Sequence, residues 1–230
     1  RRVLFRSKSI NRNALIALIA AVILREHPES TIVTDSVTSD GLAKFIADRN
    51  GKHHRFRRGY KNVINESLRL NAKGEESWLA IETSGHAALR ENYFLDDGAY
   101  LVAKLIVEAA CLRKEGKELQ DLIADLQQPV ESKEIRFKID TNDFKAYGEQ
   151  VLEHIKTAAE KESDWQLVSP NHEGVRIACT GEEEQGWFLL RQSLHDPVLP
   201  LNIESNVEGG VNRITERVIN LLSDFKALKQ

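Results

Sequence analysis

The sequence predicts two consecutive domains: a three-layer α/β domain with a mostly parallel sheet, and a smaller α+β domain with an antiparallel sheet and two helices. Two observations lead to this fold class. Strand-like and helix-like segments alternate through residues 8–128, which favours parallel strands joined by helices. After Pro129 the order becomes strand, helix, several strands and a final helix. We therefore place the domains at residues 8–128 and 133–230, with a linker at residues 129–133.

The first elements follow from caps, breakers and apolar spacing. Residues 11–26 are expected to form a helix, because Asn11 or Asn13 can cap its start and apolar residues recur at helical spacing. Pro28 ends this helix. The segments that follow are a buried strand at 31–34, a helix from Asp40 that ends before Gly51, and a strand at 54–57.

The second half of this domain continues the alternation. The expected elements are a helix at 60–70, a strand at 78–81, a long helix opened by residues 96–98 and ending near 113, and a further helix at 118–126. Asp96 and Asp97 place two carboxylates at the positive end of the long helix. Cys111 belongs to an apolar run, so we expect a buried free thiol there.

In the smaller domain, helices and strands are expected in a different order. Residues 135–139 alternate like a half-buried strand, and residues 143–162 have the spacing of an amphipathic helix. Further strands are expected at 165–168, 175–179, 187–191 and 201–204, before a closing helix at 211–228.

Composition excludes several classes of function. The 230 residues are 41% hydrophobic and carry a net charge of −3, which gives no general reason to bind nucleic acid or an anionic membrane. No apolar run approaches the roughly 20 residues that span a bilayer. The two cysteines have no metal-ligand spacing and fit a reducing cytoplasm. We leave residues 1–7, which lack an initiator Met, out of the fold and expect the sequence to be cut on that side.

A first candidate binding loop directly follows the strand at 78–81. Glu82, Ser84 and His86 bring a carboxylate, a hydroxyl and an imidazole within five residues, and Gly85 permits a sharp turn. Such a set can exchange several hydrogen bonds with a polyol. The spacing alone also fits an ordinary helix entry or turn.

A second candidate loop follows the strand at 187–191. Arg191 can hold two phosphate oxygens, while Ser193 and a protonated His195 can each donate a further bond. Pro197 stiffens the exit from this loop. An arginine–aspartate surface pair beside a turn is the alternative.

A third segment, residues 53–61, is basic with interleaved aromatic side chains. It fits a solvated edge, a nucleic-acid-binding patch, or a cationic wall beside a phosphorylated metabolite, with Arg58, Gly59, Tyr60 and Lys61 as secondary substrate contacts. The two histidines at 53 and 54 lie next to each other on a strand, so they should point to opposite faces and not share a metal.

Together the loops resemble one family, the α-D-phosphohexomutases (phosphomannomutase/phosphoglucomutase). The segment at residues 82–86, followed by the Asp-Asp-Gly at 96–98, is similar to the sugar-binding loop of that family's third domain. Residues 191–197 are similar to the phosphate loop Arg-x-Ser-x-Thr-Glu-Pro of its fourth domain. The sequence departs from the family pattern at His195, where Thr is usual, at Val37, where many relatives have Lys, and at Tyr60, where many have His.

The resemblance implies a four-domain enzyme that interconverts hexose 1-phosphate and hexose 6-phosphate through a phosphoserine and a hexose 1,6-bisphosphate intermediate. It implies that Glu82, Ser84 and His86 bind the sugar and that Arg191, Ser193 and His195 bind the phosphate. The catalytic serine and the Mg²⁺ ligands of the family lie in its first two domains, and this sequence contains neither motif. Catalytic and metal-binding residues are therefore not expected in this chain. Its partners would be a hexose phosphate and the N-terminal domains of the same protein.

Two other classes of function remain open from the sequence. A stand-alone, non-catalytic sugar-phosphate-binding protein would use the same loops. A nucleic-acid-binding module would use residues 53–61 and show steeply salt-dependent binding.

Overall fold

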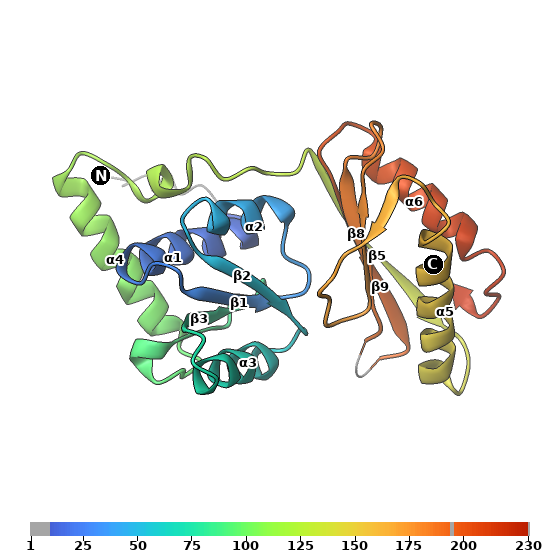
Figure 1. The fold of residues 1–230 in the computed structure, drawn as a ribbon, viewed down its shortest axis with the longest axis horizontal. Coiled ribbons are helices and arrows are strands. Elements are labelled where there is room, and N and C mark those ends of the chain that lie inside the picture. Colours follow the sequence, from blue (N-terminus) through green and yellow to red (C-terminus); the bar gives the residue numbers. More distant parts are fainter. Residues whose placement is uncertain (1–9, 194–195, 230) are drawn as a thin grey trace, which may run out of the picture. The chain divides into compact units, whose positions relative to one another are not determined.

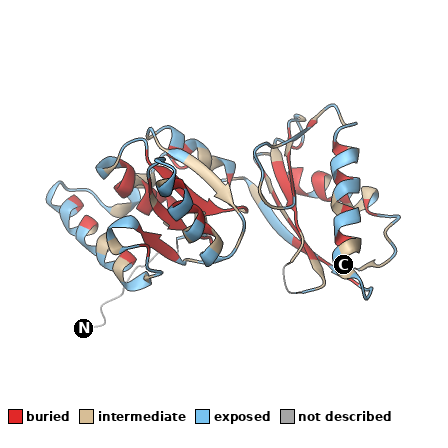
Figure 2. Ribbon diagram, turned by 60° about the horizontal axis from the view of Figure 1, so that its bottom comes forward, coloured by how far each residue is buried: buried red, intermediate tan, exposed pale blue. Residues whose placement is uncertain are grey.

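The computed structural model describes residues 10–193 and 196–229, and its chain forms two compact units, Arg1–Gln127 and Gln128–Gln230. Each unit has its own hydrophobic core, and the buried residues gather on the strands of both sheets (Figure 2). The structure confirms the predicted fold class: a mostly parallel sheet with helices in the first unit, and an antiparallel sheet with helices in the second.

The first unit is built on a four-stranded sheet of order β2-β1-β3-β4. Its strands are β1 (Thr31–Asp35), β2 (Lys52–Phe56), β3 (Ser77–Ile81) and β4 (Ala87–Leu89). The first three strands are parallel, and β4 pairs antiparallel with β3. Its helices are α1 (Arg12–Glu26), α2 (Asp40–Ala47), α3 (Tyr60–Ala72) and α4 (Gly98–Lys114).

Helices cover both faces of this sheet, which makes three layers (Figure 1). Ile32 of β1 and Leu79 of β3 pack into the core beneath α1, α2 and α4. The next residues along the same strands, Val33 and Ala80, pack instead against α3. This is the alternation that strand geometry requires, and it explains why β1 is buried along its whole length.

Local chemistry sets the starts of the helices. The Asn11 side chain accepts a hydrogen bond from the Ala14 amide at 2.7 Å and caps α1, while Ser39 caps α2 in the same way. Asp97 caps α4 by accepting from the amides of Ala99 and Tyr100, both at 3.0 Å. Of the two carboxylates expected at this helix end, only Asp97 has that role.

Two predictions for this unit were wrong. The expected helix at 118–126 is only a short 3-10 helix, Leu119–Ile123. Cys111 is exposed and not buried, because α4 turns Leu101, Glu108 and Leu112 toward the unit and the rest of the apolar run away from it. An apolar run in a helix does not reveal which side packs.

The second unit has a six-stranded sheet of order β10-β5-β9-β8-β7-β6, and its pairings are antiparallel. Its strands are β5 (Glu131–Ile139), β6 (Trp165–Leu167), β7 (Val175–Cys179), β8 (Gly186–Leu190), β9 (Val198–Ser205) and β10 (Leu228–Lys229). Its helices, α5 (Phe144–Ala159) and α6 (Gly210–Leu221), pack their apolar sides on one core with the sheet. Because β5 starts at Glu131, the expected linker at 129–133 extends too far.

Across the described residues, no helix is both long enough and apolar enough to cross a membrane.

Candidate functional site

Three loops of the first unit begin at the same edge of its sheet. They follow β1, β2 and β3, whose carboxyl ends lie side by side because the strands are parallel neighbours. In open α/β sheets this edge is where ligands bind. The predicted sugar-binding residues Glu82, Ser84 and His86 belong to the loop after β3, and the basic segment runs from β2 through the loop after it into α3.

Residues 82–86 form a tight turn that two backbone hydrogen bonds close. The Glu82 amide donates to the His86 carbonyl at 2.9 Å, and the Gly85 amide donates to the Glu82 carbonyl at 3.0 Å. Gly85 has φ +98°, a conformation that favours glycine. The turn leaves Ser84 and His86 exposed while Glu82 is buried.

Glu82 joins two of the loops. One carboxylate oxygen accepts from the Gly59 amide at 2.5 Å, and the other accepts from the Ser84 hydroxyl at 3.0 Å. Gly59 has φ +113°, which turns its amide toward Glu82 at the start of α3. Since an ionised carboxylate offers about four acceptor positions, both oxygens can still accept from a ligand hydroxyl.

Asp35, which ends β1, joins the third loop to the other two. Its carboxylate accepts from the Thr83 hydroxyl at 2.6 Å and from the Thr83 amide at 3.4 Å, and Arg58 Nε lies 3.6 Å away. The Asp35 side chain is completely buried. Neither Asp35 nor Thr83 was among the site residues predicted from the sequence.

Burial raises the pKa of Asp35 from its ordinary value to about 6, although the bond from Thr83 and the charge of Arg58 act in the opposite direction. The nearby Glu82 carboxylate adds to the increase. A carboxyl group that titrates close to neutral pH is typical of functional sites as well as of buried networks.

His86 is oriented by groups on both of its sides. Its Nδ1 lies 2.7 Å from Asp96 Oδ2, and because an ionised carboxylate only accepts, Nδ1 carries the proton. The Tyr60 ring stacks beside the imidazole, with 5.2 Å between the ring centroids. Lys61 Nζ lies 5.9 Å from the centre of the Tyr60 ring. His86 Nε2 is then the atom that can meet a ligand.

The basic segment at residues 53–61 is largely paired within its own unit. His53 Nε2 lies 2.8 Å from Thr34 Oγ1, whereas His54 Nε2 lies 2.9 Å from Glu66 Oε1 on α3. The two rings therefore point to opposite faces of the sheet. Arg55 pairs with Asp40 at 2.8 Å. These pairings reduce the charge that a nucleic-acid backbone would meet.

The predicted phosphate loop connects β8 to β9 in the second unit. The Arg191 amide donates to the Pro200 carbonyl at 3.1 Å, and the Ser193 amide donates to the Val198 carbonyl at 3.0 Å. The Ser193 hydroxyl accepts from the Asp196 amide at 3.3 Å, so its own proton can still be donated. The third predicted phosphate ligand, His195, lies outside the described residues.

The predicted phosphate loop contacts the start of α5 and the segment before β7. The side-chain Nε2 of Gln192 donates to the Phe144 carbonyl at the start of α5, at 3.1 Å. Gly174 lies so close that a Cβ there would be 2.2 Å from the Leu190 carbonyl oxygen and 2.8 Å from Arg191 Cα. Gly174 also has φ +60°, so the position suits glycine on two grounds.

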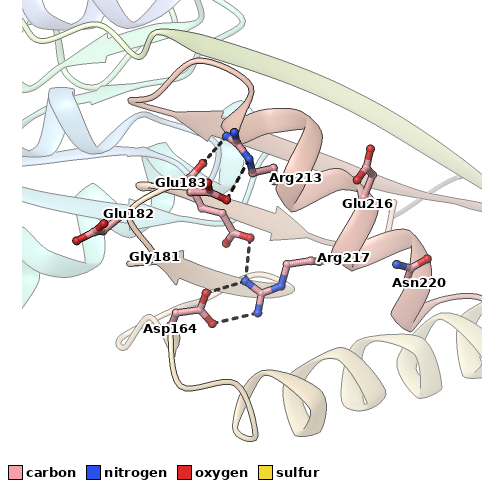
Figure 3. Close-up of a pocket in the computed structure, with 9 residues that line it drawn as sticks. Asp164, Gly181, Glu182, Glu183, Arg213, Glu216, Arg217 and Asn220 are labelled. Atoms are coloured by element: carbon pink, nitrogen blue, oxygen red, sulfur yellow. Dashed lines mark hydrogen bonds and ion pairs between the residues drawn. The ribbon is translucent and has the colours of Figure 1, made fainter.

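A second polar cluster of this unit surrounds Arg217. Arg217 pairs with the carboxylates of Asp164 and Glu184, both at 2.8 Å, beside a cavity of about 470 Å³. Figure 3 shows its guanidinium directed toward Asp164. Hydrogen bonding with Asp164 raises the pKa of Arg217, and its guanidinium lies over the Trp165 ring at 4.2 Å. These contacts tie β6, the turn at 181–185 and α6 together, so we assign the cluster a structural role.

No group of three or more His, Cys, Asp or Glu side chains within residues 10–193 and 196–229 could hold a metal ion.

Comparison with known proteins gives one family model and a set of relatives. The model described as phosphoglucomutase/phosphomannomutase, alpha/beta/alpha domain III, matches residues 11–130. A phosphomannomutase/phosphoglucomutase of Pseudomonas syringae pv. tomato is 28% identical over 203 residues, which cover 87% of this chain and 39% of the relative. A phosphomannomutase of Methanocaldococcus jannaschii is 28% identical over 214 residues, which cover 93% of this chain and 42% of the relative.

Solved structures of similar fold cover nearly the whole chain. A phosphoglucomutase/phosphomannomutase family protein from Burkholderia thailandensis superposes with a TM-score of 0.74 at 22% identity, over 96% of this chain and 43% of that one. The parafusin phosphoglucomutase of Paramecium gives 0.61 at 15% identity, over 92% and 41%. At these identities the likeness shows the fold. The chain spans about two fifths of the length of the relatives it matches.

Proposed function

Since the chain belongs to the phosphoglucomutase/phosphomannomutase family, whose α/β/α domain III matches residues 11–130, we propose that it supplies the sugar-binding and phosphate-binding loops of a hexose-phosphate mutase. The observation that carries this proposal is the bonding among the three loops at the carboxyl edge of the first sheet. Glu82 accepts hydrogen bonds from Gly59 and Ser84, and Asp35 accepts one from Thr83. These bonds fix the positions of the loops before a ligand binds.

The sugar is read, in this proposal, by Glu82, Ser84 and His86. Glu82 accepts from ring hydroxyls with its remaining lone pairs, Ser84 exchanges hydrogen bonds, and His86 Nε2 faces the ligand because Asp96 occupies Nδ1. A carboxylate can accept from either of two adjacent hydroxyls, which tolerates a sugar that binds in two orientations. Orientation, and not proton transfer, is the role we assign to these residues.

The phosphate is held by Arg191 and Ser193, together with His195. A guanidinium presents a planar fork of donors that matches two phosphate oxygens, and the Ser193 proton is available for a third bond. In the first unit, Arg58, Gly59, Tyr60 and Lys61 are proposed as secondary contacts. Of these, Gly59 and Arg58 act partly through the loops, because they already contact Glu82 and Asp35.

The reaction we propose for the whole protein is the interconversion of hexose 1-phosphate and hexose 6-phosphate through a hexose 1,6-bisphosphate. Mg²⁺ would supply charge stabilisation to the transferred phosphoryl group. No group of His, Cys, Asp or Glu side chains among the described residues fits a Mg²⁺ site, so we assign no metal ligand to this chain. We assign it no catalytic residue either, because the phosphoserine motif of the family does not occur in its sequence. Further domains of the same protein would hold both. A reducing cytoplasm suits the exposed thiol of Cys111.

Calorimetric titration of the 230-residue chain with glucose 1-phosphate, mannose 1-phosphate and inorganic phosphate tests these roles. Arg191→Ala should lower the affinity for all three ligands. Losing a charged hydrogen-bond partner typically costs about 1.5–3 kcal/mol, or roughly tenfold to more than a hundredfold in affinity. Arg191→Lys should recover only part of that loss, since an ammonium lacks the fork. Glu82→Gln should weaken the two sugar phosphates unequally and leave inorganic phosphate nearly unchanged.

Arg136→Ala is the matched control, because it removes a positive charge from an exposed position on β5. It should leave all three affinities within error. The proposal is wrong if Glu82→Gln abolishes inorganic phosphate binding while Arg191→Ala leaves that binding intact.

A further inference from the structure

Helix α4 is apolar on the side that faces away from its own unit. Val102, Ile106 and Val107 are exposed by 55%, 63% and 63%, and the exposed Ala103 and Ala110 lie on the same side of the helix. We call this set the outer α4 face: Val102, Ala103, Ile106, Val107 and Ala110. The opposite side of the same helix buries Leu101 and Leu112 in the unit.

A helix that is apolar all round is normally buried all round. Helix α1 obeys this rule, because nine of its residues, from Ala14 to Leu24, are buried. Helix α4 has apolar residues on both sides but buries only three residues. A contiguous apolar surface of this kind marks an interaction site on a soluble protein.

Two charged residues of α4, Lys104 and Glu108, are paired within the unit and do not cover this face, whereas Arg113 and Lys114 lie at its C-terminal end. Glu108 binds Arg25 of α1 at 2.6 Å. Lys104 binds Glu26 and Glu91, both at 2.9 Å. The stretch from Val102 to Ala110 therefore stays apolar, and a partner can cover it while Arg113 and Lys114 remain at its rim.

The loop before α4 has an unusual backbone conformation and also exposes large side chains. Tyr93 and Phe94 both have φ +55°, which is uncommon for bulky residues and costs free energy at each position. The Phe94 side chain is buried, whereas Tyr93 is 87% exposed and Leu95 is 58% exposed. The strained backbone thus holds two large side chains in solvent beside the start of α4.

We propose that the outer α4 face docks a neighbouring domain of this family, of the kind that the relatives carry outside the region matched here. The chain spans about two fifths of those relatives and matches their C-terminal part, and the family model that matches α4 is that of a third domain. A domain of the same polypeptide is present at high effective concentration, so a moderate apolar face is enough to hold it. The inference rests on family membership and not on the sugar-binding roles proposed above.

Cys111, one turn after Val107 on α4, provides a natural reporter. It is exposed, whereas Cys179 is buried and burial strongly raises the pKa of its thiol, so a maleimide should label Cys111 selectively. The test compares the 230-residue chain with a fusion in which the preceding part of the Pseudomonas syringae relative, with its cysteines changed to serine, is joined before Asn11. Labelling of Cys111 should be slower in the fusion by about tenfold or more, since a tethered domain binds as if at millimolar concentration.

Within the fusion, Ile106→Glu and the milder Ile106→Gln should restore the labelling rate. Leu68→Glu is the matched control: it places the same charge at an exposed apolar position of α3 and should leave the protection unchanged. Circular dichroism of each variant checks that the fold is retained. Neither measurement depends on hexose-phosphate binding, so failure of the proposed function would not alter them.

Equal labelling of Cys111 in the fusion and in the chain would overturn the proposal. So would an equal effect of Leu68→Glu and Ile106→Glu. Protection that grows with the concentration of the 230-residue chain alone would assign the face to a second copy instead, and would also overturn it.

Discussion

Asp35 connects the three loops at the carboxyl edge of the first sheet. It ends β1, holds Thr83 after β3, and lies within ion-pair distance of Arg58 after β2. Desolvation of its completely buried carboxyl group outweighs these favourable contacts and raises its pKa to about 6. The protonation of one side chain is thus coupled to the geometry of all three loops.

Substitution of Asp35 by asparagine tests this coupling through the pH dependence of stability. Because the folded state binds the Asp35 proton more tightly than the unfolded state, this carboxyl group stabilises the fold most below its unfolded pKa of 3.8, and that contribution is lost as the pH rises to about 6. Two pKa units correspond to about 3 kcal/mol, which is the upper limit of the change. Urea unfolding of both proteins from about pH 4 to about pH 7 should show the wild type losing stability relative to Asp35→Asn. A relative stability that increases with pH would mean that the pKa of Asp35 is lowered.

Glu82, Ser84 and His86 could be proposed as site residues from the sequence, because all three belong to one short segment after a recognisable strand. Asp35 and Thr83 could not be found in the same way. They are 48 residues apart, and their contact depends on β1 and β3 being neighbours in the sheet. Asp96 shows the same limit: its partner is His86, and the two meet because the chain reverses after β4 and Asp96 pairs antiparallel with Ala88.

At the scale of elements, most helices and strands were predictable from spacing and caps, and the exceptions have physical causes. Strand β9 runs from Val198 to Ser205, although only residues 201–204 were expected. Pro200 argues against a strand because it lacks an amide proton, but its carbonyl still accepts from the Arg191 amide. Strand β4 has only three residues and follows the tight turn at 82–86, so it left no separate pattern in the sequence.

The close approach of Gly174 to the end of β8 predicts a specific sensitivity. Gly174→Ala should lower stability by about 2 kcal/mol or more, because its Cβ would overlap the Leu190 carbonyl and its φ would be strained. It should also weaken inorganic phosphate binding, since the new Cβ would lie 2.8 Å from Arg191 Cα and displace that residue. Gly209→Ala is the control: its φ is +76°, but its nearest neighbour is the end of the Arg213 side chain at 3.4 Å. Equal losses of stability and affinity in both variants, measured by urea unfolding and calorimetry, would contradict this explanation.

At the scale of the whole molecule, the chain is two compact units that each carry one of the proposed loops. Neither unit has a group of His, Cys, Asp or Glu side chains, within the part of the chain that the structure describes, that could hold a metal. The relatives named as mutases are more than twice as long as the segment they share with this chain. We therefore propose that this chain contributes ligand binding and that turnover needs the further length that the relatives have.

We expect the purified 230-residue chain to show no mutase turnover with mannose 1-phosphate or glucose 1-phosphate, even with Mg²⁺ and glucose 1,6-bisphosphate. Phosphoryl transfer depends on positioned charge and a phosphoryl donor, and we assign neither to this chain. A coupled assay for the 6-phosphate product makes the measurement, with the full-length Pseudomonas syringae relative as the positive control. Turnover by the verified chain would show that its own residues include a catalytic centre.

The central claim is that each of the two loops recognises a hexose phosphate, and backbone amide chemical shifts of the ¹⁵N-labelled chain test it most directly. Titration with glucose 1-phosphate should shift the amides of Gly59, Thr83 and Gly85 in the first unit and that of Ser193 in the second. Inorganic phosphate should shift Ser193 and leave the other three unchanged, because only the phosphate loop recognises it. Shifts confined to the cavity around Arg217, or none at either loop, would contradict the assignment of this chain to sugar-phosphate binding.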